Sequence, residues 1–229
     1  MARYRFSLSG KEIKDIVLAL FALTFAFSLA LFSTEIFASG RHFITIMQTY
    51  PSYFVQSLIA VGIGFILHEM SHKFVAQKYG LWAEFRAWPL GLLMAIGLAL
   101  FSRGGFIFAA PGAVMISPYH KTRNGYHIQI MKPEDSGKIS IVGSVTNVIL
   151  ATIFTALAFF VGWKIFNISA QVNAWLALFN MIPVSLLDGA KVFHWKQEIR
   201  IGQKIYEFPL IWFGFFMVCI ALFGLTVLI

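Results

Sequence analysis

Long apolar stretches alternate with short polar segments along the chain. A helix needs about 20 mostly apolar residues to cross the hydrocarbon core of a bilayer. The pattern therefore predicts membrane-crossing helices over residues 16–32, 53–79, 139–163, 172–187 and 208–229. The first stretch also has features of a secretory signal peptide. It is longer than the roughly 7–15 apolar residues of such a signal, so we expect a retained helix.

A sixth apolar region, residues 88–117, does not fit a simple crossing. Its first part, residues 88–101, is too short to span a bilayer. Two β-prone runs follow, 106–109 and 113–116, and the Pro111-Gly112 pair between them suits the centre of a type II turn. We expect these runs to form a β-hairpin that dips into the membrane boundary. Two irregular crossings are the alternative.

The composition agrees with a membrane location. Hydrophobic residues make up 59% of the 229 positions and charged residues only 12%. A soluble domain carries about 25% charged residues, so this chain has too little polar surface for a water-facing exterior. We therefore predict an all-α polytopic membrane protein with about six transmembrane helices and a short membrane-dipping β-hairpin. No repeat, linker or low-complexity tract divides it, and residues 1–229 are expected to form one integral membrane domain.

The net charge of +8 comes from basic residues that lie between the apolar runs. No basic stripe is interleaved with stacking aromatic residues, which argues against a nucleic-acid partner. If the N-terminus is cytoplasmic, alternate crossings leave only Arg41 and Lys164 outside, in line with the positive-inside rule. No organelle-type signal is present, so the cytoplasmic (cell) membrane is the expected location. The single cysteine, Cys219, excludes an intrachain disulfide and a cysteine-based metal site.

Three ionisable residues stand inside the second predicted span, in the sequence His68-Glu69-Met70-Ser71-His72. Residues four apart share one face of a helix, so both imidazoles can reach a single metal ion. Two histidine nitrogens and one carboxylate suit Zn²⁺ and leave one position open for water. Glu69 is displaced by about 100° from His68, close enough to reach that water without binding the metal. A chance match and a metal-free His-Glu-His network are the alternatives.

The carboxylate ligand is expected among the aspartates, of which the chain has only three. Two of them lie in polar segments at the ends of predicted spans, whereas Asp188 ends the apolar run 172–187. Pro183 removes a helical hydrogen bond and should kink or break this run. The neighbouring Gly189 permits a close backbone approach. Because His72 and Asp188 both approach the cytoplasmic end of their spans, they can meet.

Three motifs together resemble the site-2 protease family of intramembrane zinc metalloproteases. They are His-Glu-x-x-His at 68–72, Gly-x-x-x-Asn at 143–147 and Asn-x-x-Pro-x-x-x-x-Asp-Gly at 180–189. The likeness covers residues 68–189 and does not extend to the first and last spans. Residues 184–187 also lack the additional prolines that many members carry before Asp-Gly.

The resemblance implies a role for each matching residue. One Zn²⁺ per chain would be held by His68, His72 and Asp188, and Glu69 would activate water as the general base. Asn147 and Asn180 would point polar side chains at the substrate or at the developing oxyanion, where such donors stabilise the transition state.

The resemblance further implies hydrolysis of peptide bonds in transmembrane or membrane-proximal protein substrates, as in regulated intramembrane proteolysis, with a catalytic core at about residues 53–190. Protein substrates and the lipid bilayer are the expected partners, and the oligomeric state stays open. A strand edge in the 104–117 hairpin could hold a substrate extended; a packed connector is the alternative. A membrane metal or ion transporter using the same polar cluster and an inactive membrane scaffold are the alternative functions.

Overall fold

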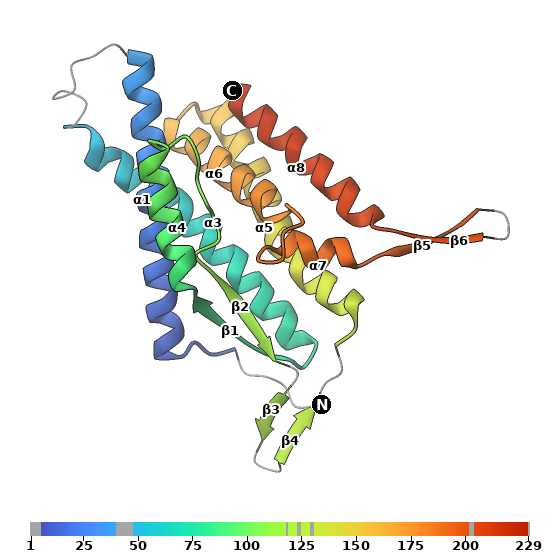
Figure 1. Cartoon of the computed structure of the whole chain (residues 1–229). Coiled ribbons are helices and arrows are strands. Elements are labelled where there is room, and N and C mark those ends of the chain that lie inside the picture. Colours follow the sequence, from blue (N-terminus) through green and yellow to red (C-terminus); the bar gives the residue numbers. More distant parts are fainter. Residues whose placement is uncertain are drawn as a thin grey trace.

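The computed structural model describes residues 6–39, 48–117, 119–122, 125–128, 131–201 and 204–228. Its helices are α1 (Gly10–Ser39), α3 (Tyr50–Lys78), α4 (Pro89–Phe101), α5 (Pro133–Val161), α6 (Lys164–Asn180), α7 (Asp188–His194) and α8 (Leu210–Leu228). Its strands are β1 (Trp82–Ala87), β2 (Gly112–Ser117), β3 (Tyr119–Thr122), β4 (Gly125–Ile128), β5 (Gln197–Ile201) and β6 (Lys204–Phe208) (Figure 1). The molecule is mostly helical, as the sequence predicts.

Within these described ranges, four helices are long and apolar enough to cross a membrane: α1, α3, α5 and α8. The helix α4 has 13 residues and α6 has 17, so neither reaches the length of those four. The expected span over 172–187 is therefore wrong in its bounds. Its helix is α6, which starts at Lys164 and ends at Asn180, because Pro183 follows and cannot continue a helix.

The helices α3, α5 and α6 pack against one another at the centre of the bundle. On one side α1 packs against α3 and α4, and on the other α8 packs against α6. Small residues are among the fully buried positions of α1 and α3, such as Ala19, Ala26 and Ala60, and small residues favour close helix packing in membranes. The exterior carries large apolar side chains such as Phe101 and Phe160, which are 91% and 82% exposed. An apolar exterior around small-residue contacts is what a bilayer favours.

A buried ion pair joins the start of α1 to the end of α3. The Lys73 Nζ atom lies 2.6 Å from Glu12 Oε2, and both residues are at most 1% exposed. The backbone N–H of Phe85 in β1 also donates to Glu12 Oε1, at 3.0 Å. This network fixes α1 and β1 to the part of α3 that follows His72.

The sheet beside the helices differs from the expected hairpin. The strand β2 pairs in antiparallel register with β1, for example Val114 with Phe85, and residues 106–109 form no strand. The expected hairpin within 104–117 is therefore wrong. The strand β2 starts at Gly112, where a Cβ atom would lie 2.5 Å from the carbonyl oxygen of Arg86. Glycine thus serves a close approach to β1 rather than a turn.

The segment 88–117 leaves the sheet and returns to it. The backbone N–H of Trp88 donates to the carbonyl oxygen of Pro111 at 2.9 Å and closes the base of the loop. At the far end, Gly104 adopts φ = +80° and packs on Ala30 of α1. Ala30 lies about 30 Å along the helix axis from Gly10, at 1.5 Å per residue. The segment therefore starts and ends at the sheet and forms a returning loop.

The path of this segment bears on the expected charge distribution. Arg103 directly precedes Gly104, which packs on Ala30 of α1. The side of the membrane on which Arg103 lies stays a prediction. Arg41, the other basic residue expected on the far side with Lys164, lies outside the described residues.

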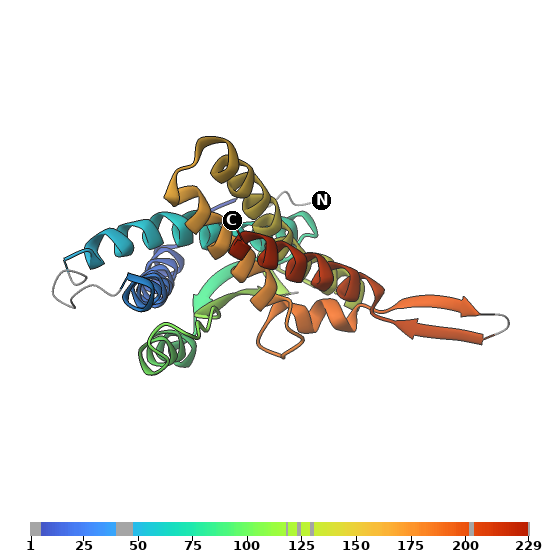
Figure 2. The same ribbon diagram turned by 90° about the horizontal axis from the view of Figure 1, so that it is seen from above.

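Two further hairpins occupy segments for which no secondary structure was predicted. The strands β3 and β4 pair in one, and β5 and β6 pair in the other, between α7 and α8. Viewed from above, the β5–β6 hairpin projects away from the bundle (Figure 2). Neither hairpin was predicted, because their short strands are rich in charged and polar residues.

Candidate metal centre

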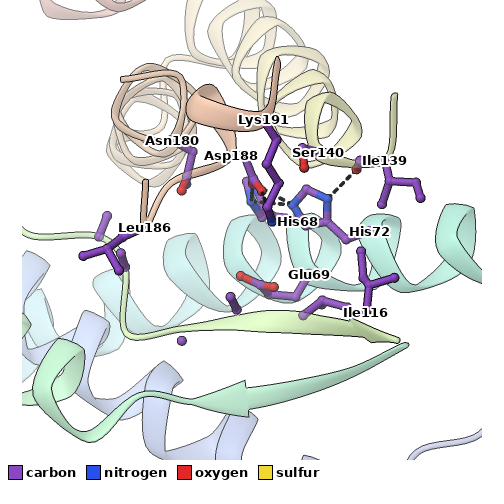
Figure 3. A pocket seen from close by; sticks show the side chains of 15 residues that line it. His68, Glu69, His72, Ile116, Ile139, Ser140, Asn180, Leu186, Asp188 and Lys191 are labelled. Carbon is purple, nitrogen blue, oxygen red and sulfur yellow. Dashed lines mark hydrogen bonds and ion pairs between the residues drawn. The ribbon is translucent and has the colours of Figure 1, made fainter. Parts of the chain in front are cut away.

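The three expected metal ligands converge inside the bundle (Figure 3). His68 and His72 stand one turn apart on α3, each is 4% exposed, and their Nε2 atoms are 3.0 Å apart. Asp188, the first residue of α7, places Oδ2 2.9 Å from His72 Nε2 and 3.3 Å from His68 Nε2. Residues 120 positions apart along the chain thus meet at one point.

The hydrogen bonds of both imidazoles explain why their Nε2 atoms face each other. His72 Nδ1 donates to the carbonyl oxygen of Ile139, 2.7 Å away. His68 Nδ1 donates to Asn147 Oδ1, 2.5 Å away. With the proton on each Nδ1, each Nε2 carries a lone pair. Two lone pairs and the Asp188 carboxylate then point at the same space, an arrangement that a bound cation stabilises.

Asp188 adds a carboxylate to the two imidazole nitrogens. The three groups therefore offer two neutral imidazole nitrogens and one carboxylate, a ligand set that fits Zn²⁺.

Glycine at two positions makes room for this cluster. A Cβ atom at Gly143 on α5 would lie 2.5 Å from His68 Nε2 and closer still to His72 Nε2. A Cβ atom at Gly189 would lie 2.6 Å from the carbonyl oxygen of Ile182. The first glycine lets α5 pass directly behind the imidazoles, and the second lets the start of α7 pack against the chain that follows α6.

Asn147 lies behind His68 rather than toward the cavity. Its side chain is fully buried, and its Oδ1 atom accepts the His68 hydrogen bond. Its amide nitrogen donates to the carbonyl oxygen of Gly64 at 3.2 Å and to Asn173 Oδ1 at 2.9 Å. Both N–H groups are thus engaged, and the geometry favours a role in orienting His68 over the implied contact with substrate.

Asn173 completes this network and was missed in the sequence. It is fully buried on α6, and its amide donates to the carbonyl oxygen of Ser169 at 2.8 Å. The signal was present, because an asparagine in an apolar segment needs a hydrogen-bonding partner. Asn180, by contrast, ends α6 at the cavity, and its amide nitrogen donates to the carbonyl oxygen of Leu176 at 3.0 Å. For the second N–H of Asn180, no partner is seen among the described residues.

Glu69 lies beside the cluster without joining it. It is 7% exposed, and its buried Oε2 atom has no hydrogen-bond partner among the described residues. Its carboxylate also faces the backbone N–H of Val114 in β2. A carboxylate oxygen left open in this way can accept a proton from a molecule held beside the metal ligands.

A cavity of about 30 Å³ connects these groups. It is bounded by the His68–His72–Asp188 cluster and Glu69, by β2 and by Lys191 of α7. A water molecule needs about 10–15 Å³ of such space, so the cavity has room for water next to the cluster. Lys191 was not among the site residues expected from the sequence.

An apolar helical bundle with a buried His-His-Asp cluster defines a membrane protein with an internal metal centre. The chain is 38% identical over 222 residues to the candidate zinc metalloprotease MJ0611 of Methanocaldococcus jannaschii, covering 95% of this chain and 98% of that protein. It is also 30% identical over 154 residues to the candidate zinc metalloprotease YwhC of Bacillus subtilis, covering 59% of this chain and 66% of that protein. The chain belongs to this family of zinc metalloproteases.

No protein-family model matches the chain. No solved structure matches it either. The family and the His68–His72–Asp188 cluster, whose ligand atoms all lie within 4.8 Å of one another, together identify Zn²⁺ as the cofactor.

Proposed function

We propose that this metalloprotease is an intramembrane enzyme of the site-2 protease type, which hydrolyses peptide bonds in transmembrane or membrane-proximal protein substrates. The observation that carries the proposal is the position of the cluster. It lies within a bundle of apolar helices, next to Glu69, whose Oε2 atom has no hydrogen-bond partner among the described residues. Ionisable groups at such depth are costly, so they mark a functional site.

In this mechanism His68, His72 and Asp188 hold the zinc ion. When bound, zinc lowers the pKa of water toward about 7 and polarises a carbonyl group. Glu69 takes one proton from the attacking water as its oxygen bonds to the carbonyl carbon of the peptide. The C–N bond then breaks, and Glu69 passes the proton to the departing amine. The products are a carboxylic acid and an amine, and Glu69 ends as it began; the acid then ionises by giving the second water proton to the amine or to solvent.

The sheet offers a way to present the substrate. One edge of β2 is paired with β1, while Ala113, Val114 and Ile116 of β2 line the cavity with Glu69. A peptide bond inside a helix is shielded by the helical hydrogen bonds, so cleavage requires an extended substrate. We infer that the substrate adds to the edge of β2 that lies opposite β1 as a further strand, held by backbone hydrogen bonds.

A second cavity suits the approach of an apolar substrate. It has a volume of about 260 Å³ and lies between α1, α6, α8 and the segment after α4. Its walls are mostly apolar, with Phe27, Ile168 and Phe223 among them and Gln171 as a polar exception. A membrane-spanning substrate arrives laterally from the lipid, and an apolar groove between helices is the surface that such a segment would pack against.

We propose that the N-terminus is cytoplasmic and that the protein resides in the cell membrane. The helices α1, α3, α5, α6 and α8 then cross in alternate directions, and α4 re-enters. In this arrangement α1 and α5 run outward, α3 and α6 run inward, and α7 with its cluster lies toward the cytoplasmic side. The basic residues Lys11, Lys73 and Lys191 fall on that side, as the positive-inside rule requires. Water reaches the cavity from the cytoplasm.

The test compares zinc content and cleavage in detergent-purified variants. His68→Ala and Asp188→Ala should lose zinc and activity together, whereas Glu69→Gln should keep near-stoichiometric zinc and lose cleavage of a transmembrane substrate. A transporter using the same cluster does not need a base outside the ligand set. Wild-type protein with full zinc that cleaves no transmembrane substrate, or Glu69→Gln protein that cleaves normally, would contradict the proposal.

A further inference from the structure

Lys191 brings a full positive charge to the edge of the metal centre. Among the described residues that line the cavity, it is the one lysine or arginine side chain. Asp188 and Lys191 are three residues apart on α7, so they share one face of that helix. Figure 3 shows the lysine side chain running from α7 past Asp188 toward Glu69.

The contact between Lys191 and Asp188 is loose. The Nζ atom lies 3.9 Å from Oδ1 of Asp188, the carboxylate oxygen that does not face the histidines. This separation is too long for a hydrogen bond. The lysine side chain is also 44% exposed. Its ammonium group therefore keeps its hydrogen-bond donors available for a molecule that enters the cavity.

The other donors around the cavity are largely engaged. Both N–H groups of Asn147 are used inside the protein, as are the Nδ1 protons of His68 and His72. Within the described part of the chain, Asn180 has one N–H without a partner. Hydrolysis places negative charge on the carbonyl oxygen of the scissile bond, and a preorganised donor aimed at such an oxygen is typically worth about 100-fold or more in kcat.

We propose that Lys191 is a further catalytic residue, whose ammonium group donates a hydrogen bond to the carbonyl oxygen of the scissile peptide bond as that oxygen becomes negative. This inference rests on the proposed proteolytic function. As the water oxygen bonds to the carbonyl carbon, the π electron pair moves onto the carbonyl oxygen, beside the lysine charge. The pair returns when the C–N bond breaks, and the lysine proton is not transferred.

A purely structural role for Lys191 makes a different prediction. If the lysine only held Asp188 in place, its loss would weaken zinc binding, and activity would fall in proportion to the zinc lost. If it contacts the oxyanion, zinc content and KM stay close to their wild-type values and kcat alone falls.

The experiment uses full-length protein in detergent or proteoliposomes with Lys191→Met, Lys191→Arg and the control Lys196→Met. Lys196 is similarly exposed, at 46%, and pairs with Glu207 on the β5–β6 hairpin. We expect Lys191→Met to keep stoichiometric zinc and to lose about 100-fold in kcat, with KM within about threefold. Lys191→Arg should recover part of this loss, and Lys196→Met should match wild type.

A binding measurement provides a readout independent of turnover. A peptide with a phosphinate in place of the scissile bond carries the negative tetrahedral group that Lys191 is proposed to face. Its affinity should fall by about the same factor as kcat in Lys191→Met, while Lys196→Met leaves it unchanged. Wild-type kcat in Lys191→Met, unchanged phosphinate affinity, or loss of zinc together with activity would overturn the inference. Zinc-loaded wild-type protein that cleaves nothing would instead refute the proposed function, and the inference would fall with it.

Discussion

Replacing Gly143 by alanine is a sharp test of how the metal centre is built. The added Cβ atom would lie 2.5 Å from His68 Nε2 and nearer still to His72 Nε2. Non-bonded atoms of this kind approach to about 3.5 Å, so the imidazoles or α5 must retreat by about 1 Å. Each imidazole is anchored through Nδ1, to Asn147 or to the Ile139 carbonyl, and cannot rotate freely.

A shift of this size is large for a zinc site, where ligand distances hold within about 0.2 Å. We therefore expect the zinc affinity of Gly143→Ala to fall by about 100-fold or more, which corresponds to about 2.8 kcal/mol. The helix itself should not suffer, because alanine is favoured over glycine in a helix interior by up to about 1 kcal/mol.

The assay is a competition titration of zinc against a chelator, with thermal unfolding of the same samples. Gly214→Ala on α8 is the matched control, because a Cβ atom at Gly214 meets nothing within 4 Å. The control should bind zinc like wild type. Wild-type zinc affinity in Gly143→Ala would refute the placement of α5 directly behind the two histidines.

Three further predictions follow from the same contacts. Asn147→Leu should weaken zinc binding by about 10–100-fold, because His68 loses the partner that sets its tautomer and ring orientation; chelator competition measures this loss, and wild-type affinity would contradict the orienting role. Lys73→Met should destabilise the protein by about 3–5 kcal/mol in thermal unfolding, because it leaves the buried Glu12 carboxylate unpaired. The double variant Glu12→Gln/Lys73→Met should recover part of that loss. Equal stability of the single variant and wild type would contradict a buried ion pair. Removing zinc by chelation should lower the unfolding temperature, and adding zinc back should restore it. The free energy of unfolding should rise by about 1.4 kcal/mol per tenfold rise in free zinc above Kd. An unfolding temperature that does not change with zinc concentration would contradict an internal metal site.

The parts of the site that could be predicted depend on local spacing. His68 and His72 share a helix face because they are four residues apart. Asp188 could be chosen because it alone among the aspartates ends an apolar run. The membrane class followed from the scarcity of charge. These features need no knowledge of which segments pack together.

The remaining features depend on contacts between distant segments. The strand β1 contains Glu84 and Arg86, so its sequence resembles that of a polar connector. Its pairing with β2 joins segments on either side of α4, and no residue pattern in either strand predicts it. From the sequence, Asn147 could contact the substrate or orient His68. The structure favours the second role, because both of its N–H groups donate to Gly64 and Asn173. The sequence does not indicate that Lys191 lies at the site, because its position depends on α7, from which its side chain runs toward Glu69 (Figure 3).

The most direct test of intramembrane proteolysis is to locate the cleaved bond. A single-span substrate is reconstituted into liposomes with wild-type protein or with Glu69→Gln, and the new termini are identified by mass spectrometry. The proposed mechanism predicts termini inside or at the edge of the apolar span, formed by wild type and absent with Glu69→Gln. Termini found only in soluble regions far from the span, or equal cleavage by both proteins, would contradict it.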